Sequence, residues 1–543
     1  MILTVAQMQE VEQAAFARGI KAADLMEEAG AGIACVVEQF FPIDFFPNST
    51  SDANCGVAPV LASSSIRYTL SPCAPEAPGD SSPEASLERS LMSGTCVVYC
   101  GKGNNAGDAL VAARYLAECG WKILVRLSFL REEMAPLPQS HLQTLLQEYD
   151  AKCIEKISKI ATYPLVLLDG VLGIGAQGAP RGPLATFIEE MNKLRRECGA
   201  FTVAVDLPSG LDLTTGVPSE CCVEADLTVT IAYAKTGLLA DTATNNVGRL
   251  AVVPLTELKS SEGDEGSLIT PKLLQASLPS RSFDVHKGMF GHVGIIAGSR
   301  GYLGAARLAA TAALHAGAGL VTLYGLPETY ELLAVSVPPE VMVKPIACYT
   351  DVLLESLHAL VIGPGLGLQY HSEILEIIEK ATIPCLIDAD ALNALAREMP
   401  SLLKAHGPRL VTPHPGEMER LFPRQDRTRV AWATDFVEKY SVTLLLKGAR
   451  TIIAEQKQPL VYNTTGNPGM AAGGMGDVLS GVAAAFLAAG HQPREAAMLG
   501  AWLCGHAAEL SIFQGTASQE SLVASDIINN LGRAMKNLRA GVF

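Results

Sequence analysis

Short apolar runs alternate with helix-length stretches along almost the whole chain, and this alternation constrains the fold more than any other feature. In the first half the runs are TCVVYC, WKILVRLSF, YPLVLLD, FTVAVDLP and ADLTVTIAY. In the second half they are HVGIIAGS, GLVTLYG, HALVIGPG, PCLIDAD, PRLVTPHP and VTLLLKG. Helical stretches, such as residues 106–119 and 184–196, lie between them. The pattern predicts an α/β protein whose parallel sheets are covered by helices on both faces.

A polar stretch rich in Ser and Gly, around residues 256–282, separates the two series of runs. A chain of 543 residues is too long for one ordinary core, so we expect two domains, residues 1–260 and 261–543. A second irregular stretch, residues 48–93, holds 11 Ser and 5 Pro in 46 residues and has no helical or strand periodicity. We expect it to be a disordered surface insertion in the first domain.

Charge and composition exclude several classes of protein. The net charge of −15 disfavours general binding to nucleic acid or to an anionic membrane. Charges interrupt the long apolar segments, and the first residues lack a basic region before an apolar stretch, so we expect neither a membrane span nor a secretory signal. The 13 cysteines include no CxxC pair, which is typical of reduced thiols in a cytoplasmic protein. We expect small-molecule partners, and homo-oligomerisation stays open.

The run GNPGMAAGGMGDVLSG, residues 466–481, contains six glycines and a single charged residue, Asp477. A helix that begins near Gly476 presents unpaired N–H groups and the positive end of its dipole, which together favour an anion. An isolated carboxylate at this point is suited to take the proton of a substrate hydroxyl that receives a phosphoryl group. We therefore predict phosphoryl transfer, in which residues 473–476 hold the phosphoryl group and Asp477 accepts the hydroxyl proton. The stretch KGART, residues 447–451, follows an apolar run and is predicted to seat the nucleotide phosphates near Lys447. The absence of GxxxxGK(S/T) argues against a Walker-type nucleotide site.

Polar residues also follow three strands of the first half. Asn105 lies in the glycine-rich turn CGKGNNAGD, Asp169 ends the run LLD, and Ser209 lies in VDLPSG. Loops at the carboxyl ends of parallel strands meet at one edge of a sheet, and oxygen ligands suit a hard cation. One formal charge favours a monovalent ion. Spacing alone supports equally well the alternative of three separate caps or turns.

The segments GKGNNAGD, LLDGVLGIG, VDLPSGLDLTTG and IAYAKTGLL resemble the NAD(P)H-hydrate epimerase family over about residues 1–255. The resemblance implies a Rossmann-like domain, with potassium bound by Asn105, Asp169 and Ser209. It implies that substrate is held by Asp206 and by two loops, which comprise Asn104, Asn105, Ala106, Gly107 and Asp108, and Gly173, Ile174, Gly175, Ala176, Gln177, Gly178 and Ala179. Asp206 and Lys235 are the candidate acid/base pair. Lys102, Ala106 and Ala109 depart from the family's usual asparagine and two glycines.

The second half carries GPGLG, DADALN, TPHPGE, KGART and the glycine-rich run in that order. Together they resemble ribokinase-like kinases and, among these, the ADP- or ATP-dependent NAD(P)H-hydrate dehydratases, over about residues 265–540. The resemblance implies ADP or ATP as co-substrate and magnesium at the dehydratase site. The implied substrate contacts are Ala305, Gly365 or Gly367, His414 and Asp477. The implied nucleotide contacts are Lys447, Gly448, Ala449, Arg450, Thr451 and Gly476. Ala472 stands where the family often has threonine.

These resemblances predict two three-layer α/β/α domains that repair hydrated NADH and NADPH. The first domain epimerises the R- and S-forms, and the second phosphorylates the hydroxyl of the S-form and expels it as phosphate. The alternative is a ribokinase-like vitamin or sugar kinase fused to a non-catalytic Rossmann-like binding module. The presence of both Asp206 and Lys235 favours the epimerase.

Overall fold

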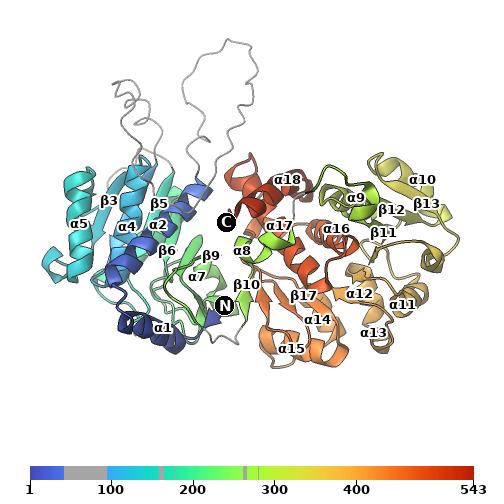
Figure 1. Ribbon diagram of the computed structural model, residues 1–543, viewed down its shortest axis with the longest axis horizontal. Helices are drawn as coiled ribbons and strands as arrows, with labels where there is room; N and C mark the ends of the chain where they lie inside the picture. The colour runs from blue at the N-terminus through green and yellow to red at the C-terminus, as the bar shows by residue number, and fades with distance from the viewer. Residues whose placement is uncertain (42–93, 158–163, 177, 261–265, 279–280, 543) are drawn as a thin grey trace, which may run out of the picture.

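Two separate large β-sheets organise the computed structural model, one in each half of the chain (Figure 1). The structure describes residues 1–41, 94–157, 164–176, 178–260, 266–278 and 281–542. The insertion predicted over residues 48–93 lies outside these described residues. A small two-stranded sheet pairs β1 (Ile2–Leu3) with β8 (Ala234–Lys235).

The sheet of the first half has seven strands, all parallel. In spatial order they are β4 (Lys152–Cys153), β3 (Lys122–Leu127), β2 (Thr95–Cys100), β5 (Leu165–Gly170), β6 (Phe201–Val205), β7 (Leu227–Ile231) and β9 (Arg249–Val253). Strands β2 and β5 are buried at every position, as expected of strands covered on both faces. The register places Asp169, near the end of β5, between Tyr99 and Ala204 of the neighbouring strands.

Helices cover both faces of this sheet. Side chains of α2 (Ala22–Phe40), α4 (Asn104–Glu118) and α5 (Pro136–Glu148) pack in one core with Val98 of the sheet. Side chains of α6 (Pro183–Cys198) pack in another core with Val97, the adjacent residue, which points to the opposite face. The remaining helices of this half are α1 (Val5–Ala17) and α7 (Thr244–Val247).

Two glycines allow α2 and α4 to pack closely together. A Cβ added at Gly30 of α2 would lie 2.4 Å from Val111 Cγ1 of α4, and a Cβ at Gly107 of α4 would lie 2.4 Å from Met26 Sδ of α2. Real Cβ atoms do not approach other atoms so closely. Glycine is required at Gly30, where the Cβ would also meet the Ala112 backbone, whereas at Gly107 the flexible end of the Met26 side chain would have to move. This packing fixes the start of α4, and with it the polar residues of the loop after β2.

The sheet of the second half has ten strands. In spatial order they are β10 (Ser267–Leu268), β19 (Val461–Tyr462), β18 (Ile452–Ala454), β17 (Thr443–Leu446), β16 (Arg409–Val411), β15 (Cys385–Ile387), β14 (Ala359–Ile362), β11 (His292–Ile296), β12 (Leu320–Gly325) and β13 (Met342–Pro345). The strands from β17 to β13 pair in parallel, whereas β18 pairs antiparallel with both of its neighbours.

Helices again cover both faces. One face carries α9 (Leu303–His315), α16 (Met475–Ala488), α17 (Pro493–Phe513) and α18 (Ala524–Ala540). The other carries α11 (His371–Lys380), α12 (Ala389–Leu395), α14 (Pro415–Leu421) and α15 (Arg429–Tyr440). The short helices of this half are α8 (Pro271–Leu274), α10 (Pro327–Ser336) and α13 (Pro400–Leu403). Among the described residues, α17 alone is long and apolar enough to cross a membrane, and 83% of its most apolar window is buried within the protein.

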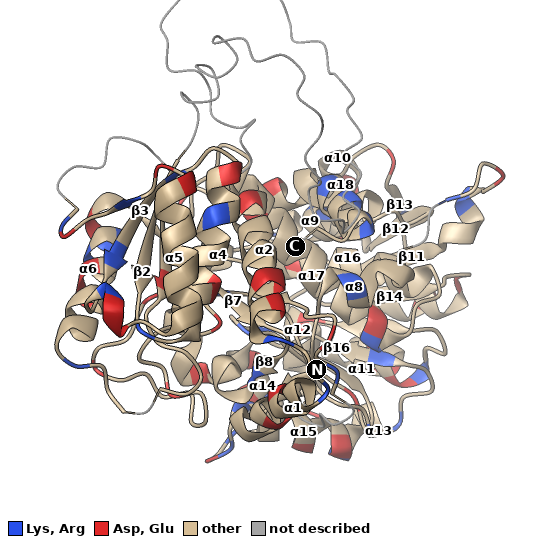
Figure 2. Cartoon of the chain, turned by 60° about the vertical axis from the view of Figure 1, so that its left-hand side comes forward, with Lys and Arg blue, Asp and Glu red and all other residues tan. Residues whose placement is uncertain are grey.

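The two halves are packed against each other. Figure 1 shows α17, α18 and β10 on the side of the second half that faces the first. Ile2 and Leu250 of the first half belong to the same buried apolar cluster as Tyr462 of the second. The rings of Phe40 and Phe513, from α2 and α17, meet edge to face with centroids 5.1 Å apart. Figure 2 shows acidic and basic residues interspersed along the elements of both halves.

All eleven apolar runs that predicted strands contain strands, but eight of the described strands were not predicted. These are β1, β4, β8, β9, β10, β13, β18 and β19, with five residues or fewer each. Most of these strands lack both the length at which alternation becomes recognisable and a longer apolar run around them, such as the runs that contain the three-residue strands β15 and β16. Among the strands that were not predicted, β9 is the most important, because it lies at the edge of the first sheet and contacts the second half.

Candidate functional sites

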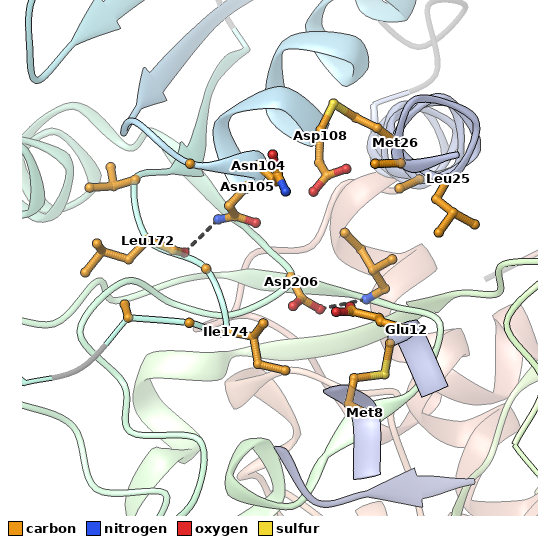
Figure 3. Close-up of a pocket in the computed structure, with 18 of the residues that line it drawn as sticks. Met8, Glu12, Leu25, Met26, Asn104, Asn105, Asp108, Leu172, Ile174 and Asp206 are labelled. Carbon is orange, nitrogen blue, oxygen red and sulfur yellow. Dashed lines mark hydrogen bonds between the residues drawn. The ribbon is translucent and has the colours of Figure 1, made fainter. Parts of the chain in front are cut away.

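A cavity of about 640 Å³ opens at the carboxyl edge of the first sheet (Figure 3). Its walls are helices α1 and α2, the start of α4, and the loop that follows β5. Nine predicted residues line it: Asn104, Asn105, Asp108, Gly173, Ile174, Gly175, Ala176, Asp206 and Lys235. Ala106 and Gly107 are buried within α4, Gly178 and Ala179 are exposed beyond the described lining, and Gln177 lies outside the described residues.

Asp206 and Lys235 form the polar centre of this cavity. Lys235 is 1% exposed, and its Nζ donates to Asp206 Oδ1 at 2.5 Å. The same ammonium group donates to Thr230 Oγ1 at 3.3 Å and to the Ile231 carbonyl at 3.1 Å. Three acceptors therefore account for its three hydrogens. The pairing of β1 with β8 fixes Lys235 in this place, since Leu3 is its partner in the register.

The carboxylate of Asp206 is held firmly through one oxygen. Besides Lys235, Oδ1 accepts from the Ile231 amide at 2.9 Å and from the Thr230 hydroxyl at 3.2 Å. The backbone of Asp206 has φ of +66°, a left-handed conformation that costs energy in a residue other than glycine. Such strain persists where the surrounding structure fixes a side chain for function.

Two further carboxyl groups line the cavity, and one of them was not predicted. Burial raises the pKa of Glu12, on α1, although the positive charge of Lys235 opposes this shift. Burial also raises the pKa of Asp108 well above its usual range, and the negative charges of Asp206 and Glu12 add to the effect. Sequence reasoning missed Glu12 because one acid in an amphipathic helix carries no motif. Figure 3 shows Glu12 and Asp206 beside each other in the cavity.

The three predicted cation ligands lie in one hydrogen-bonded network. Asp169 is fully buried and accepts from the Ser209 amide at 2.7 Å and from the Ser209 hydroxyl at 2.6 Å. Ser209 Oγ accepts from the Leu172 amide at 2.9 Å, and Asn105 Nδ2 donates to the Leu172 carbonyl at 2.7 Å. Burial raises the pKa of Asp169 to about 6, and no basic side chain among the described residues pairs with it. A buried carboxylate without a basic partner fits a bound cation.

The second site surrounds the start of α16. Gly474, with φ of +89°, caps this helix, so the amide groups of its first turn are free of helical bonds near Asp477. The pKa of Asp477 is raised to about 6, mainly by burial and in part by the negative charges of Asp388 and Asp390, while the positive charge of Lys447 opposes the shift. The ammonium group of Lys447 lies 2.8 Å from Asp388 Oδ1 and 3.8 Å from Glu417 Oε2.

Asp388, Ser480 and Glu417 complete the polar part of this site, and sequence reasoning did not select them. Ser480 Oγ donates to Asp388 Oδ2 at 2.8 Å, so the Asp388 carboxylate is held from two sides. A Cβ on Gly476 would lie 3.3 Å from Lys447 Nζ, which shows that the helix start directly adjoins the lysine. The segments DADALN and TPHPGE carried a usable signal, since each places an acid at or after a strand end.

The structure brings the predicted substrate contacts near the same strand ends. A Cβ on Gly365 would lie 2.9 Å from the Cβ of Ala305, and the Gly367 amide donates to Asp390 Oδ2 at 2.8 Å. His414 begins α14, where its Nδ1 accepts from the Gly416 amide at 3.0 Å and its side chain is 51% exposed. His414 is therefore both a helix cap and an available contact.

The predicted nucleotide residues follow β17. Gly448 has φ of +154°, and Thr451 Oγ1 donates to the Gly448 carbonyl at 3.0 Å, which closes a tight turn. The side chain of Arg450 is buried and points away from Asp477, toward the first half, where Nη2 donates to the Gly248 carbonyl. Any contact of Arg450 with a nucleotide would therefore involve its backbone.

Comparisons with known proteins agree with this division into two sites. Residues 22–237 match the family described as YjeF-related protein N-terminus, and residues 293–530 match the family described as NAD(P)H-hydrate dehydratase. The chain is 37% identical over 476 residues to the bifunctional NAD(P)H-hydrate repair enzyme Nnr of Moorella thermoacetica, which covers 82% of this chain and 88% of that protein. It is 35% identical over 449 residues to the protein of the same name from Escherichia coli, covering 80% of this chain and 84% of that one.

Among solved structures, the chain is similar to the ADP/ATP-dependent NAD(P)H-hydrate dehydratase from Bacillus subtilis, which was co-crystallised with ATP and Mg²⁺. The two share 29% sequence identity, and the match covers 50% of this chain and 99% of that one with a TM-score of 0.46.

Proposed function

The chain belongs to the family of bifunctional NAD(P)H-hydrate repair enzymes, and we propose that its two sites act in turn on one damaged cofactor. The first half epimerises the R- and S-forms of hydrated NADH or NADPH. The second half dehydrates the S-form at the expense of ADP or ATP. Two carboxylate–lysine pairs at the strand ends of two separate sheets are the observation that carries this proposal: Asp206 with the buried Lys235, and Asp388 with the partly buried Lys447. The alternative of a vitamin or sugar kinase with a non-catalytic partner does not account for the first site.

In the epimerase site we assign Asp206 as the base and Lys235 as the group that positions it. The ammonium group of Lys235 donates hydrogen bonds to Asp206, Thr230 and the Ile231 carbonyl. The bond to Oδ1 keeps the Asp206 carboxylate in place. The hydrated carbon carries a hydroxyl and the ring nitrogen. Loss of the hydroxyl proton to Asp206 allows the carbon–nitrogen bond to break, and the nitrogen takes a proton from an acid. Rotation of the resulting aldehyde and the reverse steps then give the other epimer.

Asp108 and Glu12 are the candidates for that acid. Each lines the cavity, and burial raises the pKa of each, which favours the protonated form that an acid requires. Potassium, held by Asp169, Ser209 and Asn105, would offset the buried charge of Asp169 and brace the two substrate loops. This role explains why an acid without a basic partner lies beneath the cavity.

In the dehydratase site Asp477 accepts the proton of the ring hydroxyl as that oxygen attacks the terminal phosphate of the nucleotide. Lys447 and the backbone amides of residues 473–476 stabilise the charge of the transferring group. Phosphorylation turns a poor leaving group into a good one, and the lone pair of the ring nitrogen expels it as phosphate. Loss of a proton from the adjacent ring carbon then restores the double bond of NADH or NADPH. Magnesium would be held mainly by the nucleotide phosphates, since no cluster of three suitable side chains occurs among the described residues.

We further propose that the enzyme is cytoplasmic and acts on small molecules alone. Ten of the described cysteines, among them the buried Cys96, Cys100 and Cys504, carry free thiols, which suits a reducing compartment.

A mixture of the two hydrate epimers, supplied with ADP or with ATP, tests the function directly. We expect the absorbance of the reduced nicotinamide to return completely, and chiral chromatography to show both epimers consumed. Without nucleotide the epimers should equilibrate but no NADH or NADPH should form. Accumulation of a stable phosphorylated product would instead indicate a kinase, and consumption of one epimer only would leave the first half without its proposed activity.

A further inference from the structure

A buried ion pair crosses the boundary between the two halves. Arg249 is the first residue of β9, at the edge of the first sheet, and Glu509 lies in α17 of the second half. Arg249 Nε donates to Glu509 Oε1 at 3.0 Å, and the two side chains are only 5% and 4% exposed. A charge pair so deeply buried is costly to break, because either partner alone would remain uncompensated.

Glu509 also holds the loop that leads to the second site. The backbone amide of Gly466 donates to Glu509 Oε1 at 2.8 Å, and His506 Nδ1 lies 3.1 Å from Oε2. Gly466, with φ of +115°, is the first residue of the glycine-rich run that ends at Asp477. One carboxylate oxygen therefore links an arginine of the first half to the loop that carries the proposed base of the second.

The other loop of the second site is tied to the first half as well. The carbonyl of Gly248, the residue before β9, accepts from Arg450 Nη2 in the turn that follows β17. Arg429 donates to the Arg450 carbonyl at 3.1 Å and to Asp241 Oδ1 of the first half at 3.2 Å. Residues 241–249 therefore hold both loops of the second site through hydrogen bonds and ion pairs. These loops are the turn that begins at Lys447 and the glycine-rich run that contains Asp477.

We propose that Arg249 is a positioning residue for the dehydration reaction, supplied to the nucleotide site of the second half by the epimerase half. Arg249 keeps Glu509 ionised, and the charged carboxylate anchors Gly466 and the run behind it. Without Arg249 the buried carboxyl group is left without its counter-charge, and a protonated acid accepts hydrogen bonds more weakly. The phosphate-binding amides then lose their fixed position. This inference rests on the function proposed above.

The same substitution should leave epimerisation unchanged. The cavity of the first half lies at the carboxyl ends of its strands, whereas Arg249 is at the amino end of β9. Arg249 is absent from the lining of that cavity as far as the described residues show it. The two activities of one molecule therefore serve as internal references for each other.

The test uses the full chain with Arg249→Met, which removes the charge and keeps much of the side-chain length. We expect kcat/KM for ADP or ATP to fall about tenfold or more, and the epimerisation rate to stay within about twofold of wild type. Arg126→Met is the matched control, because Arg126 also pairs with a glutamate, Glu190 at 2.7 Å, but entirely within the first half. The control should leave the nucleotide kinetics unchanged.

A double variant separates positioning from loss of stability. Arg249→Met with Glu509→Gln removes both buried charges and retains a side-chain oxygen for the Gly466 amide. We expect it to recover most of the nucleotide kcat/KM lost in Arg249→Met alone. All rates are measured well below the unfolding temperature of each variant. Wild-type kinetics in folded Arg249→Met, or an equal loss in Arg126→Met, would overturn the inference, and an inactive wild type would instead overturn the proposed function.

Discussion

Asp477 combines two properties that a base for a hydroxyl requires. It lies in the first turn of α16 beside Lys447, and burial raises its pKa to about 6. It is therefore ionised at neutral pH and still basic enough to accept a proton. Asp477→Asn should lower the dehydration rate by about 10²- to 10⁴-fold, the usual effect of losing a general base. Epimerisation by the same protein should be unaffected, and dehydration at more than about a tenth of the normal rate would remove Asp477 from the mechanism.

The raised pKa of Asp477 predicts a pH dependence with a definite sign. The base is active when ionised, so dehydration should be constant above pH 7 and should fall as the pH drops through about 6. Well below that pH the rate should decrease about tenfold per pH unit, as expected for one essential base. Circular dichroism at each pH provides the control for unfolding. A dehydration rate that stays flat down to pH 5 in folded enzyme would contradict the assignment.

The network around Asp169 predicts a dependence on potassium. Asp169→Asn keeps the shape of the side chain but removes the negative charge that the cation would neutralise. We expect epimerisation to become slower and to lose its response to potassium, measured against sodium at the same ionic strength. Dehydration with a pre-equilibrated substrate serves as the reference activity. If the variant and the wild type respond to potassium alike, the cation does not bind at Asp169.

Most proposed catalytic residues were predictable, because they follow apolar strands that the sequence marks clearly. Asp169, Asp206 and Lys447 come directly after such runs, and Asp477 stands alone among glycines. Glu12 and Arg249 were not predictable in this way. Glu12 reaches the cavity only because β1 docks α1 against β8, and Arg249 gains its partner from a helix 260 residues away. Neither contact can be recognised from the residues that adjoin Glu12 or Arg249 in the sequence.

At the scale of single elements, the contact between α2 and α4 depends on the absence of side chains at Gly30 and Gly107. Gly30→Ala would place a Cβ 2.4 Å from Val111 and push apart the helices that position the polar loop after β2. We expect a loss of about 1–3 kcal/mol in the free energy of unfolding, as is usual for overpacking. Chemical denaturation with urea measures the change.

Gly532 of α18 is a matched control for this substitution. It also lies inside a helix, but a Cβ added there would meet nothing within 4 Å. Gly532→Ala should therefore stabilise the protein by up to about 1 kcal/mol through helix propensity alone. The two glycine-to-alanine changes thus have opposite expected signs. Equal effects would show that helix propensity, rather than the close contact, decides the outcome at Gly30.

The prediction of secondary structure also failed where contacts with distant residues, rather than the local sequence, determine the element. The strands β2, β3, β5, β6, β7, β11, β12, β14, β15, β16 and β17 were predicted because each lies in a recognisable apolar run. The strand β9, RLAVV, begins with a charged residue and was missed, although it forms the boundary between the halves. Arg249 is buried only because Glu509 forms an ion pair with it. Tertiary partners, rather than propensity, decided this element.

At the scale of the molecule, the buried boundary changes what is expected of the separated halves. The polar stretch near residue 262 predicts two domains that could act alone. The boundary, however, buries Arg249 against Glu509 and Phe40 against Phe513. Separation would expose these groups and leave two charges without partners. We expect the second half alone to have a lower unfolding temperature than it has in the full chain, and weaker dehydration that added first half restores.

The measurement is the dehydration rate of the isolated second half, titrated with the isolated first half and started with the pure S-epimer. With that substrate the first half has no catalytic contribution to make, so any increase reports the physical contact. Full activity of the second half by itself, with unchanged thermal stability, would show that the boundary is dispensable.

The pairing of β1 with β8 has a consequence for how the chain is made. Ile2 and Ala234 are neighbours in the finished molecule but 232 residues apart along the chain, and the Ile2 amide also donates to the Gly266 carbonyl. At a ribosomal elongation rate of roughly 5–20 residues per second, β1 waits on the order of 10–50 seconds for its partner. The strand that seats Lys235 is therefore completed only after nearly half of the chain has been synthesised, and the hydrogen bond from Ile2 to Gly266 waits for the first residues of the second half.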